Sequence, residues 1–488
     1  MTRHLLRAAT AAAALTAFPA AAQDRSSMPG MEMPMPAPTP TPAPTPAPSP
    51  HDHMNMPGMD MPMPAEPARP GDPDRFQGYW SFPRTGCGSA SWVLTDENGN
   101  EALLDGAKCW PGEGSGTSRV PGPDGGMHGA HLMLGNWMLM AHGALWGVYT
   151  DQGGPRGDRM AFAESMAMAR AEVMATRYVR VRLNAMLSLE PAMGARGYPD
   201  LFASGETAGG VPLIDRQHPH DLFMELSGRA DYFVGDGKSL FVYGGPVGEP
   251  ALGPTAFMHR GSARYLPLAP ITHHWFDSTH ISYGVVTAGY GEEKFQIEAS
   301  AFRGREPDER RWGLETPALD SWSVRATWQP NTLWALQASH GHLKAPEATH
   351  PGEDEDRTTA SIQYASMSNS PFSAMLAFSA KKRTHGETLT AWIAEGNWNL
   401  SQHHSLFGRI ENVANDELFP NPADPLHDRK FRVTRFEGGY AYRMALSDDL
   451  GLALGGSLSA YAKPSALDAA YGKNPLGFTL FARLSLGD

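Results

Sequence analysis

The chain has 488 residues, a formal net charge of −12 at pH 7 and two cysteines. The negative charge argues against a general nucleic-acid binder and leaves cationic partners open. No stretch beyond the N-terminus approaches the roughly 20 apolar residues that a membrane-spanning helix needs, and the mean hydropathy is −0.37. These totals exclude a helical membrane protein but not a membrane β-barrel, because strands that alternate apolar and polar residues have a modest average hydropathy.

The first 22 residues have the features of a secretory signal peptide. Arg3 and Arg7 supply positive charge, residues 8–18 are apolar, and alanines at 20–22 offer a cleavage site. We therefore expect the protein to leave the cytoplasm. The expected organisation is a signal peptide (1–22), a disordered Met/Pro/His-rich arm (23–72), an irregular segment (73–126) and an outer-membrane β-barrel (127–488).

The arm carries two copies of one nine-residue phrase, at 28–36 and 56–64, separated by a Pro-Ala-Thr spacer. Its prolines remove backbone donors, so the arm cannot form a core. Exposed thioethers with imidazoles suit Cu(I) and Ag(I) and poorly suit Mg²⁺ or Ca²⁺. A solvated linker is the alternative, although linkers usually favour Gly and Ser. The predicted ligands are Met28, Met31, Met33, Met35, His51, His53, Met54, Met56, Met59, Met61 and Met63.

Residues 73–126 are rich in Gly and Pro, with one strand-like piece near 91–94. Cys87 and Cys109 are the only cysteines, and in an oxidising compartment a single pair most simply forms one disulfide. We expect an ordered but irregular segment. Whether it plugs or caps the barrel stays open.

From about residue 129 the sequence becomes strand-like. Over 179–189, Val and Leu side chains occupy one face, while Arg180, Arg182 and Asn184 lie on the other. A strand between lipid and a wet lumen has this pattern. Alternation with the apolar face toward lipid is also expected around Ile281, Tyr283 and Val285.

About sixteen such runs follow one another, with Trp and Tyr near their ends where aromatic girdles form. They predict an all-β fold, a transmembrane antiparallel β-barrel of about 14–16 strands. A large secreted soluble β-protein is the alternative. The runs lie near residues 131–150, 158–175, 177–190, 221–234, 238–246, 278–290, 293–304, 319–329, 332–344, 356–367, 371–383, 387–399, 404–415, 430–445, 450–463 and 475–487.

Two stretches without alternation, 191–220 and 246–278, end in histidine-rich phrases. In an extended segment His218 and His220 point the same way, and Asp215 or Asp221 could orient an imidazole. Imidazole suits copper or zinc, but there is no HExxH or CxxC spacing. Histidines that merely hydrogen-bond loops within the lumen are the alternative. The second candidate metal or lumen site comprises His218, His220, Asp221, His259, His273, His274 and His280.

The layout of signal peptide, Met/His-rich arm (28–63) and barrel resembles the copper-resistance protein B family of Gram-negative bacteria. This resemblance implies copper sequestration or transfer at the outer membrane. The phrases at 215–221, 272–280 and 304–309 resemble an uncharacterised family of bacterial envelope proteins, which implies relatedness and not activity.

The sequence therefore predicts an outer-membrane barrel, not an enzyme, that binds Cu(I) or Ag(I) through a periplasmic arm. Its expected partners are outer-membrane lipid, copper ions and periplasmic copper proteins. Two other functions stay open. One is a porin or structural envelope protein whose arm is only a linker, and the other is an envelope metalloenzyme that uses the His/Asp cluster.

Overall fold

The computed structural model describes residues 77–81, 91–95, 101–103, 112–125, 129–176, 178–235, 238–367, 370–447 and 449–487. The arm ligands between residues 28 and 63, and both Cys87 and Cys109, lie outside this part. The arm's metal site and the disulfide therefore stay predictions. Among the described residues, no helix is long and apolar enough to cross a membrane.

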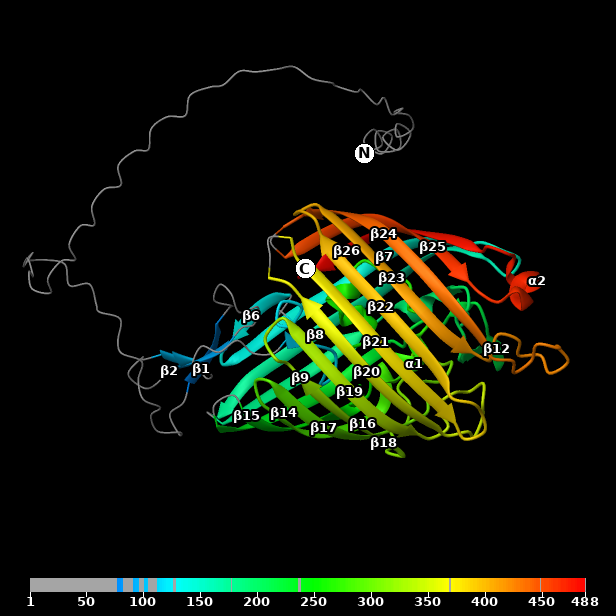
Figure 1. Ribbon diagram of the computed structural model, residues 1–488. Coiled ribbons are helices and arrows are strands. Elements are labelled where there is room, and N and C mark those ends of the chain that lie inside the picture. The colour runs from blue at the N-terminus through cyan, green and yellow to red at the C-terminus, as the bar shows by residue number, and fades with distance from the viewer. Residues whose placement is uncertain are drawn as a thin grey trace, which may run out of the picture. The chain divides into compact units, whose positions relative to one another are not determined.

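The main structure is a closed antiparallel barrel of sixteen strands (Figure 1). The ring runs through β7, β8, β9 and then β14 to β26, which pairs with β7. Its strands are β7 (Trp137–Gln152), β8 (Arg159–Thr176), β9 (Val179–Leu187), β14 (Phe223–Gly235), β15 (Lys238–Gly248), β16 (Ser282–Gly291), β17 (Phe295–Phe302), β18 (Ser321–Trp328), β19 (Trp334–Leu343), β20 (Glu355–Ala365), β21 (Phe372–Arg383), β22 (Leu389–Asn399), β23 (His404–Asn415), β24 (Phe431–Ala445), β25 (Leu450–Ala462) and β26 (Leu476–Leu486).

The predicted barrel is confirmed, and each of the sixteen expected runs overlaps one strand of the ring. The run at 131–150 also overlaps a short additional strand, β6 (Ala130–Leu134), which pairs with the first residues of β7. The two strands are joined by a turn at Gly135, where φ is +59°. Glycine adopts this left-handed conformation without steric cost.

The connections differ at the two ends of the barrel. At the short-turn end, to the left in Figure 1, strands are joined by a few residues. At the long-loop end lie the extended connections, two of which fold inward. In outer-membrane barrels short turns face the periplasm and long loops the exterior. The connections at the long-loop end are 153–158, 188–222, 249–281, 303–320, 344–354, 384–388, 416–430 and 463–475.

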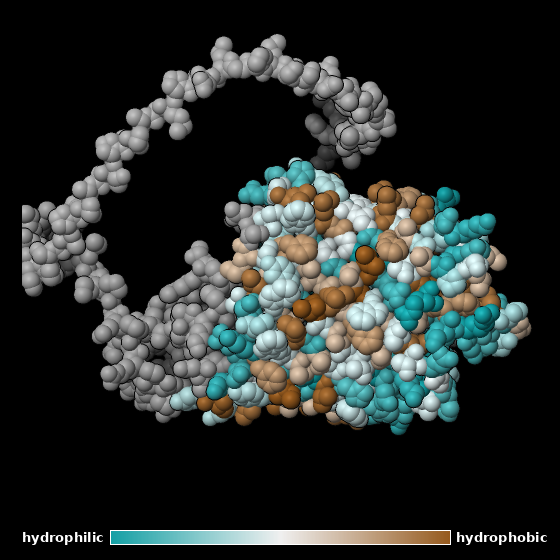
Figure 2. Space-filling model, viewed as in Figure 1, coloured by the Kyte–Doolittle hydropathy of each residue, from teal (hydrophilic) through white to brown (hydrophobic). Residues whose placement is uncertain are grey.

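The outer wall is apolar in the way that lipid requires. Leu183 is 51% exposed, whereas its neighbours Arg180 and Arg182 are buried on the inner face, as the alternation predicted. Brown apolar residues lie across the strands in Figure 2, and many teal residues lie at the long-loop end. An aromatic girdle borders the short-turn end, and its exposed members include Tyr178, Tyr232, Trp328 and Trp398.

Three segments occupy the lumen. The N-terminal plug (112–125) contains β4 (Gly112–Glu113) and β5 (Arg119–Val120). Insert 1 (188–222) contains η2 (Glu190–Met193), β10 (Tyr198–Pro199), β11 (Glu206–Ala208), β12 (Val211–Leu213) and β13 (Arg216–Gln217). Insert 2 (249–281) contains η3 (Phe257–His259), η4 (Gly261–Ala263), α1 (His273–Phe276) and η5 (Ser278–His280). The remaining helices, η6 (Ser465–Leu467) and α2 (Asp468–Tyr471), belong to the last long loop.

The segment before the barrel is more regular than predicted. Its one expected strand is present as β2 (Ser91–Thr95), but β1 (Gln77–Ser81) and β3 (Glu101–Leu103) pair with it to form a three-stranded sheet. These strands are too short to give a clear alternation. Residues 112–125 form a plug, since Arg325 on the inner wall donates to Thr117, and Gly122 N donates to Thr332 O in a short turn.

Insert 2 crosses the lumen and is anchored on several strands. Its Gly253 N donates to Ser339 Oγ at 2.9 Å, and the Thr272 hydroxyl donates to Glu411 at 2.9 Å. Ser379 donates to the Trp275 carbonyl at 2.8 Å. Thr272 N also donates to Glu411, at 3.0 Å, so these anchors satisfy backbone groups of insert 2 that would otherwise be buried without partners.

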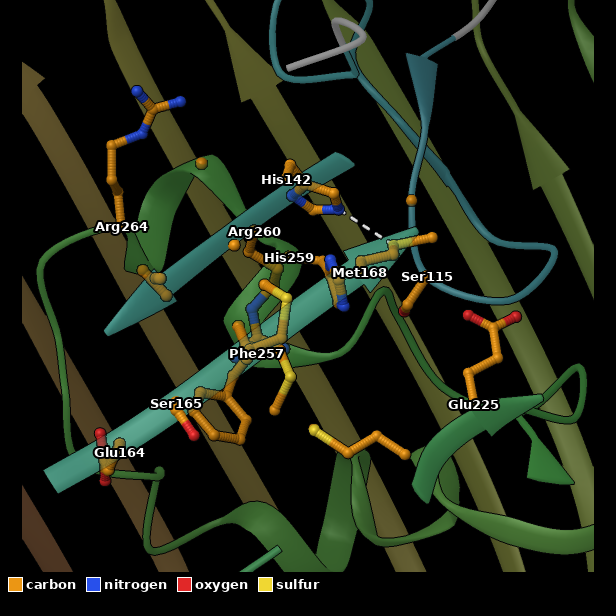
Figure 3. A pocket seen from close by; sticks show the side chains of 18 of the residues that line it. Ser115, His142, Glu164, Ser165, Met168, Glu225, Phe257, His259, Arg260 and Arg264 are labelled. Atoms are coloured by element: carbon orange, nitrogen blue, oxygen red, sulfur yellow. Dashed lines mark hydrogen bonds between the residues drawn. The ribbon is translucent and has the colours of Figure 1, made fainter. Parts of the chain in front are cut away.

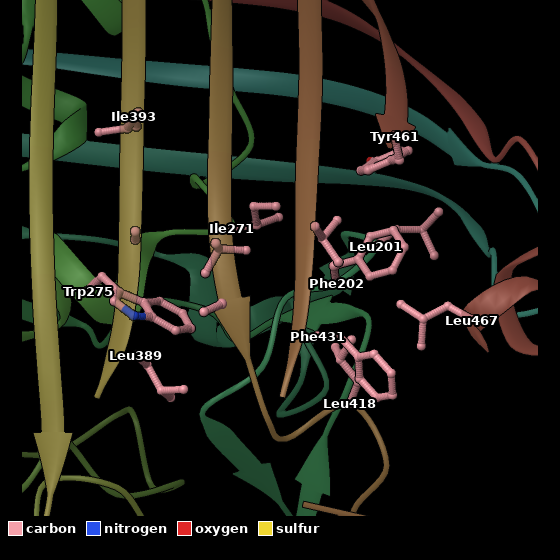
Figure 4. Close-up of a cluster of buried hydrophobic side chains, with 14 of the residues drawn as sticks. Leu201, Phe202, Ile271, Trp275, Leu389, Ile393, Leu418, Phe431, Tyr461 and Leu467 are labelled. Carbon is pink, nitrogen blue, oxygen red and sulfur yellow. The ribbon is translucent and has the colours of Figure 1, made fainter. Parts of the chain in front are cut away.

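Part of the inner wall is apolar, which differs from the predicted wet lumen. Leu201 and Phe202 of insert 1, with Ile271 and Trp275 of insert 2, pack against inward side chains of β21 to β25 (Figure 4). The expectation that Ile281, Tyr283 and Val285 face lipid was wrong, because all three are buried inside the barrel. The inserts exclude water from these wall positions, so apolar side chains are stable there. The wall residues of this cluster include Leu389, Ile393, Val413, Phe431 and Val433.

The depth of the lipid-facing band can be tested on one strand. Leu376, near the middle of β21, is 47% exposed on the outer wall, and Phe372 lies at the end of the same strand. We expect Leu376→Arg to lower the free energy of unfolding in lipid vesicles by about 2–4 kcal/mol, and Phe372→Arg by about 0–1 kcal/mol, because the cost of a charge decreases toward the interface. Urea titration with reversible folding measures both. Equal costs would contradict the assigned membrane depth.

Candidate functional site

Five imidazoles from the two inserts meet inside the lumen. Insert 1 supplies His218 and His220, and insert 2 supplies His273, His274 and His280, and we call these five residues the lumen histidine cluster. The rings of His273 and His280 are 5.3 Å apart, those of His220 and His280 5.2 Å, and those of His218 and His274 6.2 Å. All five residues are more than nine-tenths buried. The structure therefore brings together five of the seven residues predicted for the second site.

The local conformation explains part of this arrangement. Pro219 favours an extended backbone, so its neighbours His218 and His220 both face insert 2, as the sequence predicted. The phrase at 273–280 is not extended, because it folds into α1 and η5. As a result the ring of His280 packs against His273, at 5.3 Å.

Carboxylates surround the cluster, but they are not the predicted ones. Asp221 accepts a hydrogen bond from Arg311 at 3.0 Å, and Asp215 pairs with Arg156. The imidazoles contact three glutamates that are distant in sequence. These contacts are His220 Nδ1 to Glu190 at 2.8 Å, His218 Nε2 to Glu206 at 3.2 Å, and His274 Nδ1 to Glu306 at 3.2 Å.

One subset has the geometry of a metal site. One ligand atom from each of Glu206, His218 and His274 lies within 4.8 Å of the others, and all three side chains are buried. The His274 Nε2 atom has no hydrogen-bond partner among the described residues, and the same holds for His273 Nδ1 and His280 Nε2. Leaving such atoms buried and unpaired costs free energy. Nitrogen and carboxylate donors suit copper or zinc, and an ion bound at this subset would give the His274 imidazole a partner.

The electrostatic surroundings keep most of these imidazoles neutral. Burial and the nearby Arg311 lower the pKa of His218 well below its usual value, and burial with neighbouring imidazoles lowers the pKa of His280 to about 3. Burial opposes the charge on His274 too, but Glu306 and Glu206 outweigh it and raise the pKa of His274 to about 9. In the absence of an ion, His274 therefore carries the proton that a metal cation would replace.

A second group of carboxylates with a histidine has a different character. Glu347, His350 and Glu417 also place ligand atoms within 4.8 Å of one another. However, Lys381 Nζ contacts Glu347 at 2.5 Å, and Arg383 lies 3.8 Å from Glu417. These cations already neutralise the charge of the carboxylates, so we assign this group to the ion pairs that stabilise the loops at the long-loop end.

His259 does not join the lumen histidine cluster. It belongs to η3 and faces a separate cavity, where its ring lies 6.3 Å from that of His142 on β7 (Figure 3). No pattern in the sequence groups His142 with His259, because 117 positions separate them and only the fold of insert 2 brings them together.

No protein-family model matches this sequence, and no curated protein matches it either. Among solved structures it is similar to Salmonella typhi OmpF in complex with daunomycin (7% identity, 73% of this chain and 100% of that chain, TM-score 0.46). It is also similar to an anion-selective porin from Comamonas acidovorans (11%, 72% and 100%, 0.46) and to Pseudomonas putida OprB (11%, 71% and 94%, 0.45). We transfer no ligand or activity from these proteins.

The role of Glu306 in the cluster gives a prediction. In the metal-free protein, Glu306→Gln should lower the pKa of His274 from about 9, because the mutation removes the charge that stabilises the imidazolium. Glu315→Gln in the same loop is the matched control, since Glu315 pairs with Arg303 and Arg305 and not with a histidine. NMR titration of nitrogen-labelled imidazoles measures the shift. An unchanged pKa of His274 would show that Glu306 does not hold its proton.

Proposed function

We propose that this protein is a non-enzymatic outer-membrane barrel that binds copper, with the arm as the capturing element and the lumen histidine cluster as a second site. The observation that carries the proposal is the burial of five neighbouring imidazoles, two of which place ligand atoms beside Glu206, with three ring nitrogens lacking partners among the described residues. Copper is the cargo, and periplasmic copper proteins are its expected donors or acceptors.

The direction of the chain supports a periplasmic arm. The N-terminal plug contacts the short-turn end, where Arg119 donates to the Glu292 carbonyl and Gly122 N donates to the Thr332 carbonyl. Both acceptors lie in short turns, and such turns face the periplasm in outer-membrane barrels. The arm precedes this segment in the sequence, so we place its thioethers on the periplasmic side.

The protein segments that fill the lumen argue against both alternatives, a general porin and an enzyme. A general porin needs a water-filled path, whereas the plug and both inserts occupy this interior and are fixed to its wall. An enzyme needs substrate access to its catalytic groups, and the cluster is more than nine-tenths buried. A bare ion or a water molecule fits such a site better than an organic substrate does.

Removal of two cluster histidines tests the lumen site. We expect the full chain with His51→Ala and His53→Ala to bind Cu(II) with an electron paramagnetic resonance spectrum that shows nitrogen couplings, and the further changes His218→Ala and His274→Ala to remove that signal. The matched control is His403→Ala with His404→Ala, because both of these histidines are exposed near a short turn. The lumen site is refuted if the cluster variant keeps the same nitrogen-coupled spectrum as its parent.

Substitution of sulfur tests the arm. With the nine arm methionines changed to leucine, we expect the affinity of the full chain for Cu(I) to fall by about tenfold or more, because leucine keeps the volume and removes the thioether ligands. Anaerobic titration against a Cu(I) chelator measures this, and copper tolerance of cells reports the consequence. Equal Cu(I) affinity would favour a linker, and with it the porin or structural alternative.

A further inference from the structure

The cavity that His259 faces inside the barrel is lined in part by methionine sulfur atoms. It has a volume of about 190 Å³ and lies between insert 2 and the inner wall of β7, β8 and β14 (Figure 3). Sulfur atoms, drawn in yellow, gather beside His259 and Phe257 in that view. The methionines that border the cavity are Met140, Met166, Met168, Met224 and Met258.

The strand register explains why these side chains converge. On β7, Met140 and His142 are two residues apart and share the inner face, and on β8 so do Met166 and Met168. His142 lies directly opposite Met168 in the β7–β8 pairing. Insert 2 then supplies Met258 and His259 from η3, so three distant segments contribute donors to one space.

The contacts differ from those of ordinary core packing. The Nε2 atom of His142 lies 3.0 Å from the sulfur of Met168, and the dashed line in Figure 3 marks this contact. Met166 and Met258 pack against Met168 and Met224 in one cluster. A methionine used as a filler closes a gap in the core, whereas these thioethers border an open cavity together with two imidazoles.

The charges near the cavity permit a cation. Arg170 is paired with Glu113 at 3.0 Å, and Arg260 is paired with Asp277 at 3.2 Å and with Glu395 at 2.6 Å. Arg264 points away from the sulfur atoms in Figure 3. Thioethers and unprotonated imidazoles are uncharged soft donors, which favour a soft ion of low charge over Mg²⁺, Ca²⁺ or a hard divalent metal.

We propose that this cavity binds one soft monovalent metal ion, Cu(I) or Ag(I), through the thioethers of Met166 and Met168 and the imidazoles of His142 and His259. This inference adds a site to the proposed copper function. It rests on that function only for the assumption that the ion bound in the cell is copper. His220 borders the same cavity and also belongs to the lumen histidine cluster. The thioether site is therefore contiguous with the imidazole site, and the two offer successive positions for an ion inside the barrel.

The test uses Ag(I) as a redox-inert probe on the full chain in which the nine arm methionines are leucine, so that the arm does not compete. We expect this parent to bind Ag(I) with sulfur neighbours in its X-ray absorption spectrum, and Met166→Leu with Met168→Leu to weaken binding by about tenfold or more. The matched control is Met138→Leu with Met174→Leu, since both residues are buried on the same two strands outside the cavity. Heat-modifiable migration on gels confirms folding, and His142→Gln is an independent second variant.

The outcomes separate this inference from the proposed function. Loss of Ag(I) binding in both cavity variants, with the control unchanged, supports the thioether site. A parent that binds no Ag(I) through sulfur, or cavity variants with unchanged affinity, overturns it. If the His218→Ala and His274→Ala variant loses the Cu(II) signal and keeps Ag(I), the two sites are distinct. Failure of the Cu(II) experiment with retained Ag(I) would remove the proposed lumen histidine site and leave this one.

Discussion

The structure depends on closure of the strand ring by β26 and β7. Their ladder runs from Gly477 opposite Gln152 to Leu486 opposite Gly143, and it leaves the sixteen-strand ring without a free edge. In lipid no water can satisfy an unpaired backbone group, so a β-sheet is stable there only when it is closed. Closure also gives every strand one lipid-facing side and one inner side, and this division controls the whole arrangement of side chains.

The inner side of the barrel wall fixes the two inserts in the lumen. Charged residues of the inserts form ion pairs with residues of opposite charge on the barrel wall. Asp200 of insert 1 lies 2.9 Å from Arg435, and Arg260 of insert 2 lies 2.6 Å from Glu395. Buried charges need such partners, and removal of one partner is more costly than absence of the pair. These ion pairs and the apolar contacts in Figure 4 hold the inserts in defined positions. The lumen histidine cluster is consequently fixed by a scaffold, although every member belongs to a loop or a short helix.

Much of the barrel could be predicted, because alternation with a period of two is a local property. Arg180 and Arg182 on the inner face and Leu183 on the outer face follow directly from it. The prediction failed at Tyr283 and Val285, where the inner wall is covered by insert 2. Alternation shows that the two faces differ, but it does not show which face meets lipid when the lumen is itself filled with protein.

The site was predicted less completely. The histidines of the two inserts were recognisable by their density, whereas Glu190, Glu206 and Glu306 carried no local sign of a role. The sequence of β8 does contain a pattern that indicates the methionine cavity. Its outward positions are largely alanine, while Met166 and Met168 take successive inward positions. Large soft side chains on the lumen face opposite small lipid-facing ones are informative once a strand has been assigned.

The sequence by itself determined the closed barrel, since alternation depends on neighbouring residues along the chain, and it predicts export from the first 22 residues. Only the tertiary structure decided that 112–125, 188–222 and 249–281 fill the lumen and that their imidazoles and thioethers meet. The physical reason is the range of the interactions. Hydrophobic alternation acts over two residues, whereas a metal site needs donors within a few ångströms that come from segments tens of residues or more apart along the chain.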